Sequence, residues 1–101
     1  MVVLLVPLIE EVMYRGIIQE SLRRLGVHAW MAIICTSGLF ALMHLPALPP
    51  NAHHALAALF VLSLFFGWLY ERTGRLIAPV TLHAAFNAGN LLLASMYAVE
   101  G

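Results

Sequence analysis

Residues 53–70 read HHALAALFVLSLFFGWLY and contain no Asp, Glu, Lys or Arg. A helix needs about 20 mostly apolar residues to cross the roughly 30 Å hydrocarbon core of a bilayer. Three further apolar segments have comparable lengths: residues 1–25, 29–48 and 76–99. These lengths fit helices, and the alternating pattern of a membrane strand is absent. We therefore expect an all-α, multi-pass transmembrane bundle of about four helices.

Short connections separate these segments. Gly26 is a typical helix stop after the first one. The proline-rich stretch 46–51 ends the second, because proline lacks a backbone donor and disfavours a helical residue before it. Residues 71–75 predict a turn, and Pro79 either lies in the first turn of the last helix or kinks that helix. The chain has no internal repeat or linker, so we expect a single membrane domain over residues 1–101.

The composition excludes several other classes of protein. Of the 101 residues, 62% are hydrophobic and 10% are charged, whereas a soluble domain is roughly 45–50% apolar and about 25% charged. A disordered chain needs low hydrophobicity and high charge. Five arginines balance five acidic residues, so no basic stripe exists and no nucleic-acid partner is expected. The single Cys35 excludes a disulfide scaffold.

Arginine placement predicts an orientation in the membrane. Arg23 and Arg24 follow the first segment, and Arg72 and Arg75 lie between the third and fourth. In a four-helix chain these two loops fall on the same side, whereas the connection 46–51 has no Lys or Arg. The positive-inside rule then places both arginine loops in the cytoplasm of an integral membrane protein.

Ionisable and amide side chains inside apolar segments are costly in hydrocarbon, so they usually face the bundle interior and mark function. This chain has six such candidates: Glu10, Glu11, Arg15, His44, His83 and Asn87. Glu11 and Arg15 have the i,i+4 spacing of a helical ion pair, for which a purely structural role is the simpler interpretation. Glu10 has no basic partner at i+4, so it is the better candidate for a general base or acid.

The remaining candidates also have structural alternatives. A lone buried histidine such as His44 is often a satisfied polar contact, and His83 with Asn87, at i,i+4, fits a helix–helix hydrogen bond. At 1.5 Å per residue, however, Glu10, His44, His83 and Asn87 all lie roughly 12–21 Å from one membrane face. We therefore expect three helices to bring these four groups together. Small residues in pairs four apart are expected to help by letting helices approach closely.

Three motifs support a family resemblance. Residues 10–16, EEVMYRG, look like an EExxxR motif; residues 40–44, FALMH, look like FxxxH; and residues 83–87, HAAFN, look like HxxxN. Residues 70–79, YERTGRLIAP, resemble the segment that precedes the last motif. Together, over about residues 7–92, the chain resembles the CPBP (Abi) intramembrane endopeptidases, the group that includes the type II CAAX prenyl endopeptidases.

The resemblance implies a membrane-embedded peptidase. By position, Glu10 and His44 would activate the attacking water, and His83 and Asn87 would stabilise the oxyanion. Supporting residues would be Glu11, Arg15 and Phe40. The expected partners are a peptide or protein substrate at the membrane, of which a prenylated CAAX-type peptide is one form, and the lipid bilayer.

The resemblance leaves cofactor and completeness open. Family members are commonly labelled metalloproteases, and Glu10, His44 and His83 would be the ligands of a divalent metal such as Zn²⁺. A metal-free glutamate mechanism explains Asn87 better. Members generally carry helices before the first motif, whereas this chain begins nine residues before Glu10. It would therefore be the core of the protease domain, with a fragment lacking N-terminal helices as one interpretation.

Two other functions use the same residues. A catalytically silent relative, acting as a membrane immunity or partner-binding protein, would keep the polar cluster for packing. A small transporter or proton-conducting subunit would use the Glu and His residues to carry protons. Loss of cleavage in a Glu10→Gln variant separates the peptidase from the silent relative, and proton flux in liposomes tests the transporter.

Overall fold

The computed structural model describes the backbone of residues 5–100 and the side chains of residues 5–97. Its elements are α1 (Leu5–Glu11), the π-helix η1 (Val12–Gln19), α2 (Glu20–Arg24), α3 (Ala29–Met43), the 3-10 helix η2 (Leu45–Ala47), α4 (His53–Thr73) and α5 (Ile77–Glu100). The first three follow one another without a break and form one N-terminal helix. The predicted all-α bundle of four helices is confirmed.

The N-terminal helix differs from expectation in the middle. Residues 12–19 are π-helical, and the amide of Glu20 donates to the carbonyl of Arg15 instead of to a carbonyl four residues back. Hydrogen bonds of this i→i+5 kind widen the turn and are frequent at functional sites. The hydrophobic pattern cannot distinguish this segment from an ordinary α-helix.

The connections fall close to their expected places. Gly26 and Gly74 have positive φ angles of 92° and 67°, the conformation that ends helices at glycine. The turn predicted at residues 71–75 is shorter than expected, because α4 continues to Thr73 before Gly74 ends it. Pro79 lies in the first turn of α5, where its missing N–H has no helical acceptor to lose, so it does not interrupt the helix.

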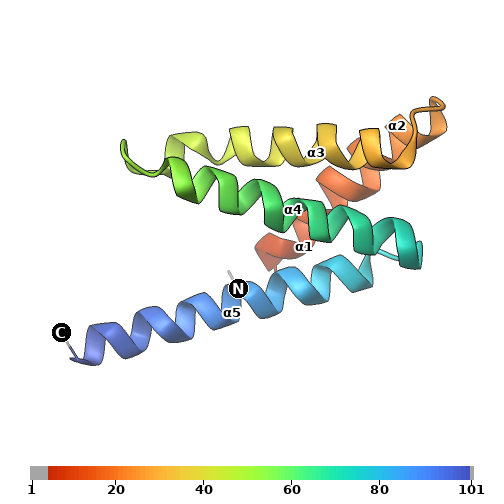
Figure 1. Cartoon of the computed structure of the whole chain (residues 1–101). Coiled ribbons are helices and arrows are strands. Elements are labelled where there is room, and N and C mark those ends of the chain that lie inside the picture. The colour runs from red at the N-terminus through yellow and green to blue at the C-terminus, as the bar shows by residue number, and fades with distance from the viewer. Residues whose placement is uncertain (1–4, 101) are drawn as a thin grey trace.

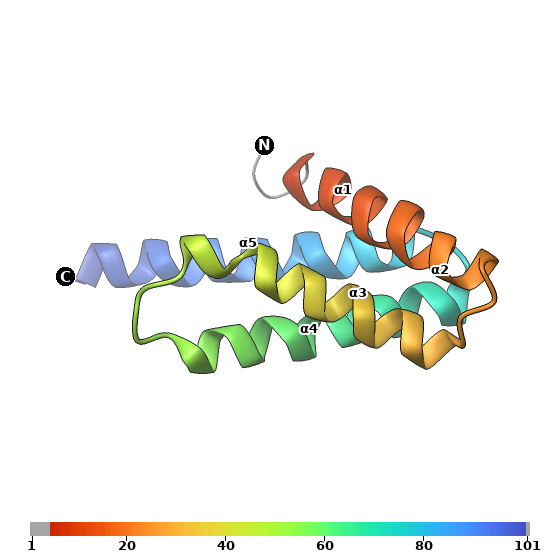
Figure 2. The same ribbon diagram turned by 90° about the horizontal axis from the view of Figure 1, so that it is seen from above.

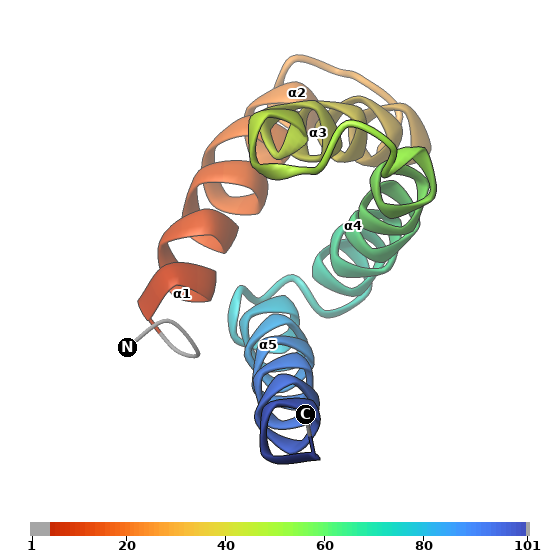
Figure 3. The same cartoon turned by 90° about the vertical axis from the view of Figure 1, so that its left-hand side faces the viewer.

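The four helices lie around an arc when the molecule is viewed end-on, in the order α1, α3, α4 and α5 (Figure 3). The arc closes because α1 also packs against α5, and η1 contacts both α3 and α4. The α2–α3 and α4–α5 connections lie at the same end of the bundle (Figures 1 and 2). The C-terminal end of α5 extends past the other helices at the opposite end.

The distribution of side chains is that of a membrane protein. Three segments are long and apolar enough to cross a bilayer: Ala29–Ala47, His53–Thr73 and Ile77–Tyr97. Large apolar side chains cover the outside of every helix, whereas the most deeply buried groups include seven polar ones. They are Glu11, Arg15, Gln19, Thr36, Ser37, Ser63 and His83. An apolar exterior suits a lipid environment, and the polar groups gather inside, where several of them pair with one another.

Only one of the expected close approaches at small residues occurs. A Cβ added to Gly67 on α4 would lie 2.9 Å from Gln19 Oε1 and 3.0 Å from a methyl of Ile33. A Cβ on Gly89 would meet nothing within 4 Å, and Ala85 and Ala88 are exposed. The small residues of α5 therefore do not pack helices together within the described residues, and the tight packing lies between η1, α3 and α4.

Candidate active site

Three helices bring a carboxylate and two imidazoles into contact. Glu10, at the end of α1, has Oε2 at 3.3 Å from Nε2 of His44 and Oε1 at 3.5 Å from Nε2 of His83. His44 follows the last residue of α3, and His83 lies in α5. The expected convergence of these three residues is confirmed. Glu10, which has no partner along its own helix, finds both of its partners on other helices.

The neighbouring Glu11 contacts the opposite side of the same imidazole. Its Oε2 is 2.9 Å from Nδ1 of His83, and its Oε1 is 3.5 Å from Nε of Arg15. Glu11 and Arg15 have no exposed side-chain surface. The predicted ion pair is confirmed, but it does more than neutralise charge. It places an ionised carboxylate, which can only accept hydrogen bonds, against Nδ1 of His83.

Aromatic rings hold the two histidines from the sides. The Nδ1 of His44 lies 2.6 Å from the carbonyl oxygen of Phe40, one turn earlier, and the two rings are 4.4 Å apart. Phe66 of α4 stacks on His83 at 4.7 Å. The guanidinium of Arg15 lies over both phenyl rings, at 5.6 and 5.5 Å from their centres. These cation–π contacts favour a buried arginine that has few other partners.

The contacts determine where protons can lie. A carbonyl oxygen only accepts, so Nδ1 of His44 carries the hydrogen that it donates to Phe40. By the same reasoning Nδ1 of His83 donates to Glu11. Both Nε2 atoms then face Glu10, at 3.3 and 3.5 Å. A carboxylate and an imidazole this close together have the geometry from which a general acid–base pair can be built.

Asn87 lies one turn after His83 on α5, so the two side chains project from the same face of the helix. Its side chain is partly buried. Within residues 5–97, no protein group is in hydrogen-bond contact with its amide. Of the four predicted catalytic residues, the structure thus joins Glu10, His44 and His83 directly. Asn87 lies one helical turn from His83, and its amide has no hydrogen-bond partner among residues 5–97.

Sequence reasoning missed the residues of α4 that complete the site. Arg15 donates to both the carbonyl and the hydroxyl oxygen of Ser63, and Phe66 covers His83. Nothing about a serine or a phenylalanine in an apolar run marks it as part of a site. One sequence signal was available. The buried polar residues of the N-terminal helix are spaced by four, and so are Ser63, Gly67 and Glu71 on α4.

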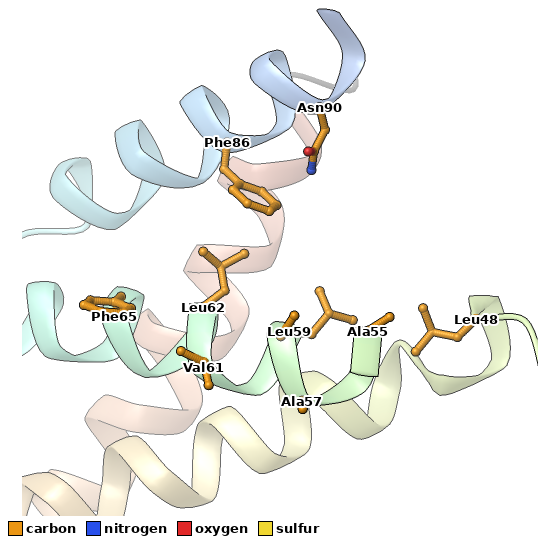
Figure 4. A pocket seen from close by; sticks show the side chains of 10 residues that line it. Leu48, Ala55, Ala57, Leu59, Val61, Leu62, Phe65, Phe86 and Asn90 are labelled. Carbon is orange, nitrogen blue, oxygen red and sulfur yellow. The ribbon is translucent and has the colours of Figure 1, made fainter. Parts of the chain in front are cut away.

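A groove of about 640 Å³ lies beside the site, between α4 and α5. Phe86 and Asn90 point into it from α5, toward Leu62 and its neighbours on α4 (Figure 4). Asn90 is the one polar residue among those that line the groove. None of the four predicted catalytic residues lines it, but Phe86 adjoins Asn87 in the chain. The groove and the polar cluster therefore share helix α5.

A comparison with known families agrees with this geometry. Residues 1–89 match the sequence profile described as type II CAAX prenyl endopeptidase Rce1-like. The chain belongs to this family. The match covers all three motifs and therefore every residue of the polar cluster. No curated protein and no solved structure gives a significant match. The chain is thus a member of a family of membrane proteases, and its fold is that of an integral membrane protein.

The residues proposed as metal ligands do not fit a metal ion in this arrangement. Within the described part of the chain, no group of three or more His, Cys, Asp or Glu side chains is placed to hold one. Glu10 presents a different oxygen to each imidazole, Oε2 to Nε2 of His44 and Oε1 to Nε2 of His83. The chemistry derived below therefore uses only the protein's own groups and water.

Proposed function

We propose that this protein is an intramembrane endopeptidase in which Glu10 and His44 activate a water molecule. The observation that carries the proposal is the contact of the Glu10 carboxylate with two imidazoles, at 3.3 and 3.5 Å, inside a membrane domain. A carboxylate and an imidazole in contact can take a proton from water and return it later. Partial burial strengthens each electrostatic interaction, because it lowers the effective dielectric constant around the pair.

The proposed reaction begins with a water molecule bound beside the contacting pair of Glu10 and His44. Its oxygen attacks the scissile carbonyl carbon while its proton passes to the carboxylate–imidazole pair. The resulting tetrahedral intermediate collapses by breaking the C–N bond, and the same pair delivers the proton to the leaving amine. The side chains of Glu10 and His44 are 22% and 28% exposed, so water can reach them, unlike the fully enclosed Glu11.

We assign His83 and Asn87 to the oxyanion. Since Glu11 accepts from Nδ1 of His83, Nε2 can donate toward the oxyanion only when the ring holds a proton on both nitrogens, and this imidazolium form is the one we propose to act in the reaction. The amide of Asn87 supplies a second donor from the same helical face. Each such donor is commonly worth about 10²–10³ in rate. Glu11 and Arg15 support this arrangement by holding the ring, and Phe40 and Phe66 limit its rotation.

The apolar groove between α4 and α5 is the proposed binding surface for the apolar part of the substrate. Its volume of about 640 Å³ suits a hydrophobic side chain or a lipid chain attached to a peptide. A prenylated CAAX-type peptide has such a chain near its cleaved bond, and the family's described activity makes it the first substrate to test.

The test is cleavage of a fluorogenic, prenylated peptide by the purified protein in nanodiscs. Wild type is compared with Glu10→Gln, which keeps the shape of the side chain and removes the base. We expect turnover to fall by at least about 10³-fold in the variant, while the thermal melting curve stays the same. A parallel series with a chelator measures metal dependence directly.

Retained cleavage in Glu10→Gln would contradict the proposed mechanism. If wild type and variant are both inactive yet folded, the silent partner-binding alternative gains support. An unprenylated peptide of the same sequence serves as the control for the groove, because it should be cleaved with a higher KM.

A further inference from the structure

A ladder of polar contacts connects the N-terminal helix to α4. Arg15 donates to Ser63, Gln19 donates to the carbonyl of Gly67 at 3.1 Å, and both pairs are 48 residues apart in the chain. Arg23 then pairs with Glu71 at 3.2 Å. A constant offset between successive pairs means that the two helices run parallel, with one contact at each turn.

Two rungs of this ladder, at Arg15 and Gln19, lie in the π-helical segment. Residues four apart on an α-helix drift by about 40° per step around the axis, and the wider turns of residues 12–19 change that drift on the N-terminal helix. The partner row, Ser63, Gly67 and Glu71, lies in regular α-helix.

At its Arg15 end, the ladder continues through Glu11 to His83, the histidine that we assign to the oxyanion. Ser63 accepts from Arg15, Arg15 pairs with Glu11 at 3.5 Å, and Glu11 accepts from His83 at 2.9 Å. Ser63, Arg15 and Glu11 are completely buried, and the ring of His83 is nearly so. No solvent separates these groups, so a movement of Ser63 is passed directly through Arg15 and Glu11 to the imidazole.

We infer that Ser63 is a positioning residue, which acts through Arg15 and Glu11 to hold Nδ1 of His83 against a carboxylate and so to aim Nε2 at the substrate. The catalytic part of this inference rests on the proposed function, whereas the structural part, the orientation of the His83 ring, does not. Arg15 donates to two oxygens of Ser63, the side-chain hydroxyl and the backbone carbonyl. Alanine at this position removes that oxygen and leaves the helix intact.

The chain offers a closely matched control. Ser37 on α3 is as fully buried as Ser63, but its hydroxyl has no hydrogen-bond partner among the described residues. Ser37→Ala therefore removes the same atoms from the interior without touching the ladder. Ser63→Thr serves as the conservative variant, because it keeps the hydroxyl. All three variants are checked for helical content and melting temperature in the same detergent.

The first measurement is the ¹⁵N spectrum of histidine-labelled protein in nanodiscs. We expect Ser63→Ala to shift the ring signals of His83, with those of His28, His53 and His54 unchanged. Ser37→Ala should leave the His83 signals in place, and Ser63→Thr should restore them. Unchanged His83 signals in Ser63→Ala, or equal shifts in both alanine variants, would overturn the inference even if no peptide substrate is ever cleaved.

The second measurement is a double-mutant cycle on turnover. Ser63→Ala should lower kcat by about 3–10-fold with KM unchanged, since one hydrogen bond to a charged group is removed. In a Glu11→Gln background the same change should have no further effect, because the connection to His83 is already broken. Additive effects would show that Ser63 influences the enzyme only through general packing and would overturn the catalytic part.

Discussion

Glu11 and His83 are 72 residues apart in the chain, and Oε2 of the first lies 2.9 Å from Nδ1 of the second. The same imidazole meets Glu10 through its other nitrogen. Two consecutive carboxylates on one helix therefore contact opposite edges of one ring. We propose that this arrangement divides their roles: Glu11, enclosed and paired with Arg15, orients the ring, whereas the partly exposed Glu10 exchanges protons.

Glu11→Ala is expected to destabilise the fold strongly. It leaves the buried guanidinium of Arg15 without its carboxylate and Nδ1 of His83 without an acceptor. Removing one partner of a buried ion pair costs about 3–5 kcal/mol. The measurement is thermal unfolding in detergent, with Glu20→Ala as the control, because Glu20 forms a much more exposed pair with Arg24. Equal melting temperatures for the two variants would contradict this assignment.

His83→Ala and Asn87→Ala are expected to reduce kcat by about 10²–10³ each while changing KM little, since an oxyanion forms only after substrate has bound. The double variant should lose less than the product of the two single losses if both donate to the same oxygen. Steady-state kinetics with a peptide substrate measures both effects. A change confined to KM would indicate that these residues bind ground-state substrate instead.

Phe40→Ala should disturb the site and the fold together. The ring is 1% exposed and contacts Tyr14, His44, Phe66 and His83. Truncating a buried phenylalanine costs about 3–5 kcal/mol through lost contacts and the cavity that remains. Melting curves of Phe40→Ala and Phe40→Leu should differ clearly, with leucine the more stable. Similar stability of the two would argue against a tightly packed aromatic frame.

Gly67→Ala and Gly89→Ala form a matched pair. The new methyl at Gly67 would lie 2.9 Å from Gln19 Oε1 and 3.0 Å from Ile33, whereas at Gly89 it meets nothing within 4 Å. We expect the first change to lower stability by about 1–3 kcal/mol through overpacking. The second should be neutral or stabilising by about 0.5–1 kcal/mol, because alanine favours the helix. Chemical or thermal unfolding of both in one detergent measures the difference.

Ala58→Trp should weaken binding of substrates that carry an apolar chain. Ala58 lines the groove between α4 and α5, so an indole there occupies space that the chain would use. KM should rise about tenfold for a prenylated peptide and change less for the unprenylated one. Ala94→Trp, on the exposed extension of α5, controls for the added side chain. An equal effect on both peptides would exclude the groove as the binding surface.

The sequence predicts much of the site because the relevant signals are local. Apolar runs ended by glycine and proline locate the helices within a few residues. A charged residue inside such a run is recognised as a candidate site residue, because it is costly in hydrocarbon. The spacing of four pairs Glu11 with Arg15 and places His83 and Asn87 on one face. The depth of each polar residue along its helix predicts that Glu10, His44, His83 and Asn87 meet, and the structure brings the first three into contact.

Other features depend on packing between helices. The π-helical turns of residues 12–19 and the role of Ser63 have no local signature, because each exists only where two helices meet in a particular register. The small residues of α5 illustrate the converse: their spacing predicts close packing that does not occur within the described residues.

The sequence by itself determined that this is an all-α membrane protein with a few polar groups at a common depth, since hydrophobicity and helical period are properties of each segment alone. The tertiary structure decided which nitrogen of His83 faces which carboxylate, and which helix holds Arg15 from behind. Those choices depend on the rotation and register of whole helices. These are determined by the sum of many contacts across the bundle, which no single segment encodes.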